Sequence, residues 1–197
     1  MVPATFIKSA ALPKDFPADS GREAAFIGRS NSGKSTALNL LAGVRKLARV
    51  SKTPGRTQLV NFFTAGEDRR LVDLPGYGFA RVNADVQDRW EQTLSAYLAE
   101  RQSLVGLVLT VDIRRGLTQL DRQLLSWLKP RALPLIVLLT KADKLSRGAG
   151  LAQQQVVGKE LGPGAQLTRF SSIDRAGVEQ ARDWLSAWFA VGSSEES

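Results

Sequence analysis

Short continuous apolar runs alternate along this chain with stretches in which apolar residues recur every three or four positions. Uninterrupted apolarity is typical of strands buried on both faces of a parallel sheet, and the wider spacing predicts amphipathic helices. We expect strands at 24–27, 104–111, 133–139 and 166–170. We expect helices at 36–42, 85–102, 118–129, 146–161 and 178–188. This alternation predicts one α/β domain built on a mostly parallel sheet.

A hairpin interrupts the alternation. Residues 59–64 and 69–73 are rich in strand-forming side chains, and the Ala-Gly-Glu-Asp turn at 65–68 separates them. Two strands joined this closely run antiparallel. The expected architecture is therefore a three-layer α/β fold with a mostly parallel six-stranded sheet, one antiparallel edge hairpin, and helices on both faces.

The ends of the chain differ from its middle. Three prolines within residues 1–23 argue against helix and predict an extended lead-in, to which Phe6 and Ile7 could add a short edge strand. The polar residues 191–197 predict a disordered tail. One nucleotide-binding domain is expected to occupy residues 24–190.

Apolar side chains at helical spacing predict which helix faces point inward. For the second helix these are Val86, Trp90, Leu94, Tyr97 and Leu98. For the third helix, which a near capping box at Thr118 and Asp121 begins, they are Leu120, Leu124, Trp127 and Leu128. For the last helix they are Val178, Ala181, Leu185 and Trp188.

The chemistry begins between the first buried strand and the first helix. Residues 28–35 read GRSNSGKS and fit the phosphate-binding pattern G-x-x-x-x-G-K-[ST]. Its glycines let backbone N–H groups surround phosphates, and the helix N-terminus adds positive potential. We expect Lys34 to reach the β- and γ-phosphates and the Ser35 hydroxyl to bind Mg²⁺.

Composition narrows the class of protein. The chain has no cysteine, which excludes disulfides and thiol catalysis, and no histidine, which removes the commonest general base and metal ligand. A hard ion held by oxygen atoms, such as Mg²⁺ on a nucleotide, is the natural metal. No apolar run approaches the ~20 residues that span a bilayer, and the N-terminus lacks a signal-peptide layout, so we expect a cytoplasmic protein with no membrane partner.

Charge indicates the kind of partner. The chain carries 27 basic and 19 acidic residues, for a net charge of +8, which suits a partner rich in phosphate. Five basic residues and no acid fall within 44–61, where Pro54 and Gly55 predict a loop. Thr57 in this loop is the natural second hydroxyl for Mg²⁺. A solvated basic loop with an incidental threonine is the alternative.

Two further loops complete a nucleotide site. Asp73 ends a strand and begins Asp-Leu-Pro-Gly, so it can hold Mg²⁺ through water while the Gly76 N–H approaches the γ-phosphate. Thr-Lys-Ala-Asp at 140–143 follows a buried strand. Asp143 can accept both the N1–H and the 2-amino group of guanine, a pairing that adenine cannot make. Lys141 can cover the base and bind back to the phosphate loop.

These motifs, in this order, resemble a Ras-like, translation-factor-class GTPase. The segments GRSNSGKS, SKTPGRTQL, VDLPGYGFA and LLTKADKL resemble more closely the bacterial EngB (YsxC/YihA) family, over nearly the whole chain. The resemblance implies a P-loop GTPase fold, GTP or GDP with Mg²⁺, and a role in assembling the large ribosomal subunit or in contact with its rRNA. It also implies a part in normal cell division and septation. We expect a monomer.

The resemblance also implies which residues bind the nucleotide. They are Gly28, Arg29, Ser30, Asn31, Ser32, Gly33, Lys34, Ser35, Gly55, Arg56, Thr57, Gln58, Leu59, Asp73, Leu74, Pro75, Gly76, Thr140, Lys141, Ala142, Asp143, Phe170, Ser171 and Ser172. Among them Lys34, Thr57 and Gly76 are expected to act in catalysis. Ser171 and Ser172 would offer a backbone N–H to guanine O6. Ile173, which follows them, departs from the family pattern.

Hydrolysis is expected to be slow. Ras-like enzymes place a water-orienting glutamine after D-x-x-G, and here that position is Tyr77. The missing stabilisation would come from a K⁺ ion held partly by Asn31, or from a partner acting in trans, since a basic loop at 44–61 that orders with GTP would display its charges to RNA only in that state. Asn31 could instead only fit the tight turn. Two other functions are weighed: a P-loop kinase acting on a small molecule, and a GTPase signalling switch acting on a protein effector.

Overall fold

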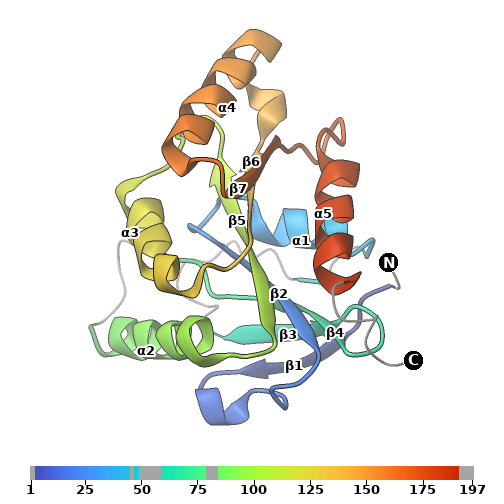
Figure 1. Ribbon diagram of the computed structural model, residues 1–197, viewed down its shortest axis with the longest axis vertical. Helices are drawn as coiled ribbons and strands as arrows, with labels where there is room; N and C mark the ends of the chain where they lie inside the picture. Colours follow the sequence, from blue (N-terminus) through green and yellow to red (C-terminus); the bar gives the residue numbers. More distant parts are fainter. Residues whose placement is uncertain (1–2, 45–46, 49–58, 79–83, 191–197) are drawn as a thin grey trace.

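A seven-stranded sheet in the order β1-β3-β4-β2-β5-β6-β7 forms the centre of the molecule (Figure 1). The computed structural model describes residues 3–44, 47–48, 59–78 and 84–190, with the backbone alone for 84–91. The strands of this described part are β1 Phe6–Ala10, β2 Arg22–Gly28, β3 Val60–Thr64, β4 Arg69–Asp73, β5 Leu104–Asp112, β6 Leu135–Thr140 and β7 Ala165–Arg169. Its α-helices are α1 Lys34–Leu41, α2 Ala84–Glu100, α3 Gln119–Leu128, α4 Arg147–Leu161 and α5 Val178–Ala190.

The sheet is mostly parallel, as the apolar pattern predicts, but it has one strand more than expected. β3 and β4 form the predicted antiparallel hairpin, and β2, β4, β5, β6 and β7 pair in parallel. The hairpin is not at the edge, because β1 pairs antiparallel with β3 through Lys8, Ser9 and Ala10. Only Phe6 and Ile7 carry a strand signal in β1, so the sequence pattern understates its length.

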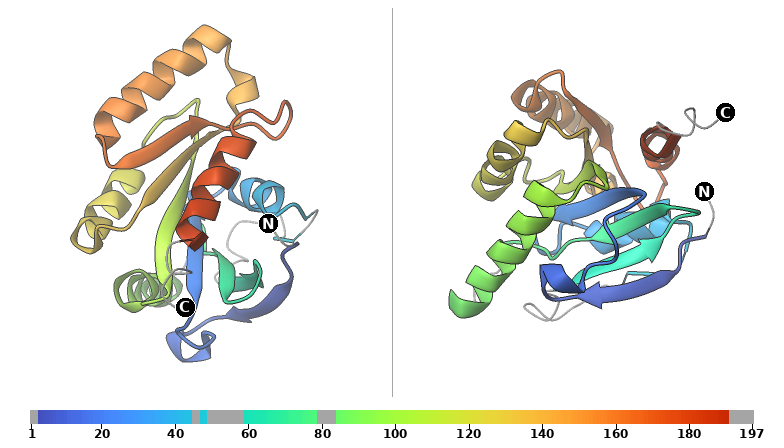
Figure 2. Two further views of the ribbon diagram at one scale, coloured as in Figure 1. Left: turned by 45° about the vertical axis from the view of Figure 1, so that its right-hand side comes forward. Right: turned by 60° about the horizontal axis from the view of Figure 1, so that its bottom comes forward.

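Helices cover both faces of the sheet (Figure 2). Leu94 and Tyr97 of α2, Leu124 of α3 and Val157 of α4 belong to one buried cluster. The other face holds a second cluster to which α1 and α5 contribute. Its helical members include Leu38, Leu41, Ala181, Leu185 and Trp188. The three-layer architecture and the buried stripe of α5 are thus confirmed.

The prediction for α3 is only half right. Leu124 is buried and Leu128 packs against the core, but the side chains of Leu120 and Trp127 are 39% and 58% exposed. Asp121, Leu124 and Leu128 recur at helical spacing and form the inward face of α3, with Asp121 2% exposed. Leu120 and Trp127 lie to one side of that face. In α2, Val86 and Trp90 lie outside the described side chains.

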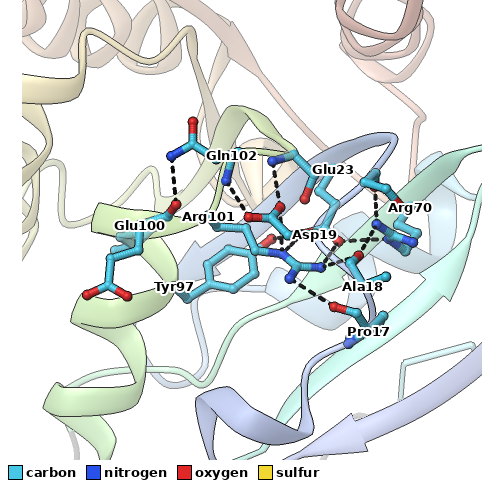
Figure 3. Close-up of polar contacts among 12 residues, drawn as sticks. Pro17, Ala18, Asp19, Glu23, Arg70, Tyr97, Glu100, Arg101 and Gln102 are labelled. Atoms are coloured by element: carbon cyan, nitrogen blue, oxygen red, sulfur yellow. Dashed lines mark hydrogen bonds and ion pairs between the residues drawn. The ribbon is translucent and has the colours of Figure 1, made fainter.

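A buried ionic cluster joins the lead-in to the sheet at the edge opposite the phosphate loop (Figure 3). The carboxylate of Glu23 is fully buried and accepts from the Tyr97 hydroxyl at 2.8 Å, from Arg70 Nε at 2.7 Å and from Arg101 at 2.7 and 3.0 Å. Arg101 also donates to the carbonyl of Pro17 at 2.9 Å. The C-terminal end of α2 is therefore fixed to the start of β2.

Candidate functional site

The phosphate loop is braced by two neighbouring strands at the carboxyl edge of the sheet. It runs from the end of β2 to Lys34, the first residue of α1, with positive φ angles at Asn31 (62°) and Gly33 (91°). The Ser32 hydroxyl lies 2.7 Å from that of Thr110 on β5. The Thr140 hydroxyl on β6 donates to the carbonyl of Ser32. Neighbouring strands thus fix the shape of the loop, with the N-terminus of α1 beside it.

The Asp-Leu-Pro-Gly segment lies along the phosphate loop. The parallel pairing of β4 with β2 brings Asp73, at the end of β4, beside Phe26. The ammonium of Lys34 forms an ion pair with the Asp73 carboxylate. A Cβ on Gly76 would lie 3.4 Å from the Gly28 carbonyl oxygen, so Gly76 touches the loop directly. The structure therefore brings together the residues predicted to contact phosphate.

The Thr-Lys-Ala-Asp segment reaches the phosphate loop as predicted. Lys141 adopts a positive φ of 58°, and its Nζ donates to the Asn31 carbonyl at 2.7 Å. Asp143 accepts from the Ser171 hydroxyl at 3.0 Å and pairs with Lys144 at 3.0 Å. Lys144, with help from Ser171, lowers the pKa of Asp143 below its usual range against the opposing effect of partial burial. Its side chain is therefore an ionised acceptor.

The loop at residues 170–172 supports the Thr-Lys-Ala-Asp segment rather than adding side chains to the site. Phe170 is 2% exposed in the hydrophobic core, and its carbonyl accepts from the Ala142 N–H at 3.2 Å. Ser171 is fully buried and donates its N–H to the Ala176 carbonyl at 3.1 Å. Ser172, in contrast, is an exposed residue.

Two residues that the motifs do not name hold Lys141 in place. Asp112 ends β5, and its Oδ2 accepts from Lys141 Nζ at 2.8 Å and from Arg114 at 2.6 Å. The Arg114 guanidinium, together with Lys141, holds the pKa of Asp112 well below its usual range, although burial opposes this. The signal in the sequence is an acid at the end of a buried strand, next to the strand that carries Thr-Lys-Ala-Asp.

A cavity of about 500 Å³ lies beside the phosphate loop, between the β5–α3 connection and Lys141. Arg29, Arg114, Arg115 and Lys141 supply its positive charges, and its carboxylates are bound to neighbouring groups. The basic character noted in the composition is thus present next to the predicted nucleotide site.

Most of the nucleotide-binding positions predicted at 55–59 lie outside the described part of the chain. Gly55, Arg56, Thr57 and Gln58 lie outside the described residues, and Leu59 precedes β3 with 37% of its surface exposed. Within the described ranges there is no cluster of three or more acidic, histidine or cysteine side chains that could hold a metal. None of the helices described there combines the length and apolarity needed to cross a bilayer.

Comparisons with known proteins agree with this geometry. A family described as 50S ribosome-binding GTPase matches residues 23–141. A protein of Coxiella burnetii named probable GTP-binding protein EngB is 48% identical over 189 residues, covering 94% of this chain and 92% of its own. A protein of the same name from Methylobacillus flagellatus is 52% identical over 188 residues, covering 94% and 91%.

Solved structures share the fold. The crystal structure of a probable GTP-binding protein engB has a TM-score of 0.68 at 22% identity, covering 85% of this chain and 98% of its own. Era from Aquifex aeolicus, bound to GDP and aluminium fluoride, has a TM-score of 0.69 at 20% identity, covering 86% and 57%. At these identities the likeness supports the fold alone. Family model, curated relatives and fold agree: the chain belongs to the family of 50S ribosome-binding GTPases, and it binds and hydrolyses GTP.

Proposed function

We propose that this GTPase is a nucleotide-controlled switch in assembly of the large ribosomal subunit, and that normal cell division and septation depend on it. The observation that carries the proposal is the basic cavity directly beside the phosphate loop. A phosphate-rich partner bound there would lie next to the nucleotide. The matching family is described as ribosome-binding, and a solved Era structure of the same fold, with a TM-score of 0.68, contains 16S ribosomal RNA.

In this proposal the phosphates of GTP bind the backbone of residues 28–35 and the Lys34 ammonium. Lys34 would exchange its partner Asp73 for phosphate oxygens. The described residues fit Mg²⁺ held partly by the nucleotide, because Ser35 offers a hydroxyl in the first turn of α1 and Asp73 lies close by. Thr57 is the proposed second hydroxyl. Bound Mg²⁺ would neutralise charge on the β- and γ-phosphates.

Guanine is the base that the remaining loops suit. The ionised Asp143 would accept the N1–H and 2-amino donors, and the stem of Lys141 would cover the ring. Since the Ser171 N–H is already bonded, we assign the contact with guanine O6 to the Ser172 N–H. A small-molecule kinase would have no use for this base-reading arrangement.

Hydrolysis would be slow without help. Lys34 and the Gly76 N–H stabilise charge on the γ-phosphate, with Thr57, but position 77 offers no amide to orient water. The exposed Asn31 side chain is our candidate for holding K⁺ beside the phosphates. Turnover measured in K⁺ and in Na⁺ tests this, and equal rates in wild type or an unaffected Asn31→Ala variant would refute it.

The experiment for the whole proposal is co-sedimentation with purified ribosomal subunits, using a non-hydrolysable GTP analogue, GDP, or no nucleotide. We expect binding to the large subunit with the analogue only. Arg115→Glu, at the basic cavity, should weaken it, while Lys159→Glu, an equal charge change on exposed α4, should not. Binding to neither subunit, with GTP hydrolysis intact, would favour the alternative of a signalling switch acting on a protein effector.

A further inference from the structure

Tyr77, which follows the Asp-Leu-Pro-Gly segment, directs its side chain into the protein. The ring is 6% exposed, and its hydroxyl donates to Asp121 near the start of α3. Burial, followed by the charge of Asp121, raises the pKa of Tyr77 far above its usual value. The hydroxyl is therefore a permanent donor rather than a proton carrier.

Asp121 uses its two carboxylate oxygens for two different purposes. Oδ2 accepts from the Thr118 N–H and the Thr118 hydroxyl, both at 2.6 Å, and so closes the capping box of α3. Oδ1 accepts from Tyr77. Capping needs only one of these oxygens, so the bond to Tyr77 is an additional link between α3 and the loop that follows β4.

The backbone of Tyr77 is fastened to the phosphate loop. Its carbonyl accepts from the Ser30 N–H at 2.9 Å, and its N–H donates to the Gly28 carbonyl at 3.3 Å. Gly76, directly before it, lies against the same two residues. Residue 77 is thus a junction: its backbone is bonded to the phosphate loop and its side chain to α3.

Gly78, the next residue, also lies close to α3. Gly78 has a φ of +79°, and a Cβ there would lie 3.1 Å from Leu120 Cδ1 and 3.2 Å from Arg29 Nε. A side chain at this position would be strained and crowded, so glycine lets the chain pass closely between α3 and Arg29. The loop is consequently held against α3 up to this point.

We propose that Tyr77 and Asp121 are positioning residues for GTP hydrolysis. They hold the Gly76 N–H at the γ-phosphate, and they couple the presence of the γ-phosphate to the first turn of α3. The residue that stands where a water-orienting glutamine is expected would then act through its hydrogen bond to α3 and not on water. This inference rests on the proposed contact of Gly76 with the γ-phosphate and not on the ribosomal partner.

The test compares Tyr77→Phe with Tyr97→Phe. Both remove a buried hydroxyl that donates to a buried carboxylate, but Tyr97 binds Glu23 at the opposite edge of the sheet. We expect Tyr77→Phe to weaken binding of a non-hydrolysable GTP analogue and to lower kcat, each by about tenfold, the size of a hydrogen bond to a charged group. The affinity of Tyr77→Phe for GDP should equal that of the wild type. Tyr97→Phe should lower the melting temperature but keep the ratio of the two affinities.

Hydrogen exchange gives a second readout. In wild type, amide protection in α3 should differ between the analogue and GDP, and Tyr77→Phe should abolish that difference while Tyr97→Phe preserves it. Should Tyr77→Phe fail to fold, Asp121→Asn, which leaves one uncharged oxygen for the three donors of Tyr77 and Thr118, should reduce the analogue affinity and the exchange difference in the same direction. An unchanged affinity ratio and exchange difference would overturn the inference. A wild type whose α3 protection is identical with the analogue and with GDP would overturn the transmission to α3, whereas a Tyr77→Phe variant with an unchanged analogue affinity would overturn the positioning of the Gly76 N–H.

Discussion

Single residues decide how firmly Lys141, the lysine proposed to cover the base, is held. Lys141 Nζ has two partners, the Asn31 carbonyl and the Asp112 carboxylate, and Asp112 is itself bound by Arg114. The lysine stem is therefore fixed at its far end by a buried charge. Asp112 thus fixes the orientation of Lys141, the side chain proposed to cover the guanine ring.

Asp112→Asn tests this role. The amide loses the charge that holds Lys141, so affinity for GDP and for a GTP analogue should both fall about tenfold. Preference for guanine over adenine should persist, because Asp143 is unchanged. Fluorescent-nucleotide titration measures both. Glu160→Gln, which removes a surface ion pair with Arg122, is the control and should change neither value. Unaltered affinity in Asp112→Asn would refute a positioning role.

The ionisation of Asp143 predicts a flat pH profile. A depressed pKa keeps this carboxylate charged above its usual value of 3.8, and the charged form is lost only as pH falls through the lowered pKa. The chain has no histidine to titrate near neutrality. The preference for GTP over ATP should therefore stay constant between about pH 5 and pH 8.

Competition binding at several pH values checks the profile. Asp143→Asn should lose the preference at every pH, since an amide cannot accept both guanine donors. A preference that declines in the wild type between those limits would show that the carboxylate is not held ionised.

At the scale of elements, helix and strand positions follow closely from local sequence, because spacing and buried apolar runs are local signals. The way in which helices and strands pack against one another does not follow from local sequence. The inward face of α3 includes Asp121, whose partner Tyr77 is remote in sequence, so the exposure of Leu120 does not follow from apolar spacing alone. In the same way the three nucleotide motifs are readable as motifs, whereas Asp112 becomes recognisable only when β5 and β6 are seen side by side.

Packing of α5 on the sheet gives a prediction at this scale. A Cβ on Gly106 of β5 would lie 2.6 Å from ring carbons of Trp188, so Gly106→Ala should reduce the free energy of unfolding by about 1–3 kcal/mol. Gly148→Ala is the control. It has open space in α4 and should raise stability by up to about 1 kcal/mol, since alanine favours helix. Urea denaturation measures both, and a neutral Gly106→Ala would show that α5 shifts freely.

At the scale of the whole molecule, the two edges of the sheet have different tasks. The carboxyl edge carries the loops proposed to bind phosphate and base, and the amino edge carries the buried cluster around Glu23 (Figure 3). That cluster binds the lead-in, β4 and the end of α2 to one carboxylate. The cluster keeps the C-terminal end of α2 fixed to the start of β2, independently of the loops proposed to bind the nucleotide at the other edge.

Removing the central charge tests this division. Glu23→Ala leaves Arg101, whose side chain is 6% exposed, without its buried partner, and breaking a buried ion pair costs about 3–5 kcal/mol. Urea denaturation should show a loss of that size, and Glu23→Gln should lose less because it keeps one acceptor. Glu179→Ala, whose side chain is 75% exposed beside Arg182, should change stability by less than about 0.5 kcal/mol. Glu23→Gln, if it folds, should bind GDP with the affinity of the wild type. The separation of the two edges would be contradicted by a Glu23→Ala variant that is as stable as wild type. A folded Glu23→Gln variant with weakened GDP binding would also contradict it.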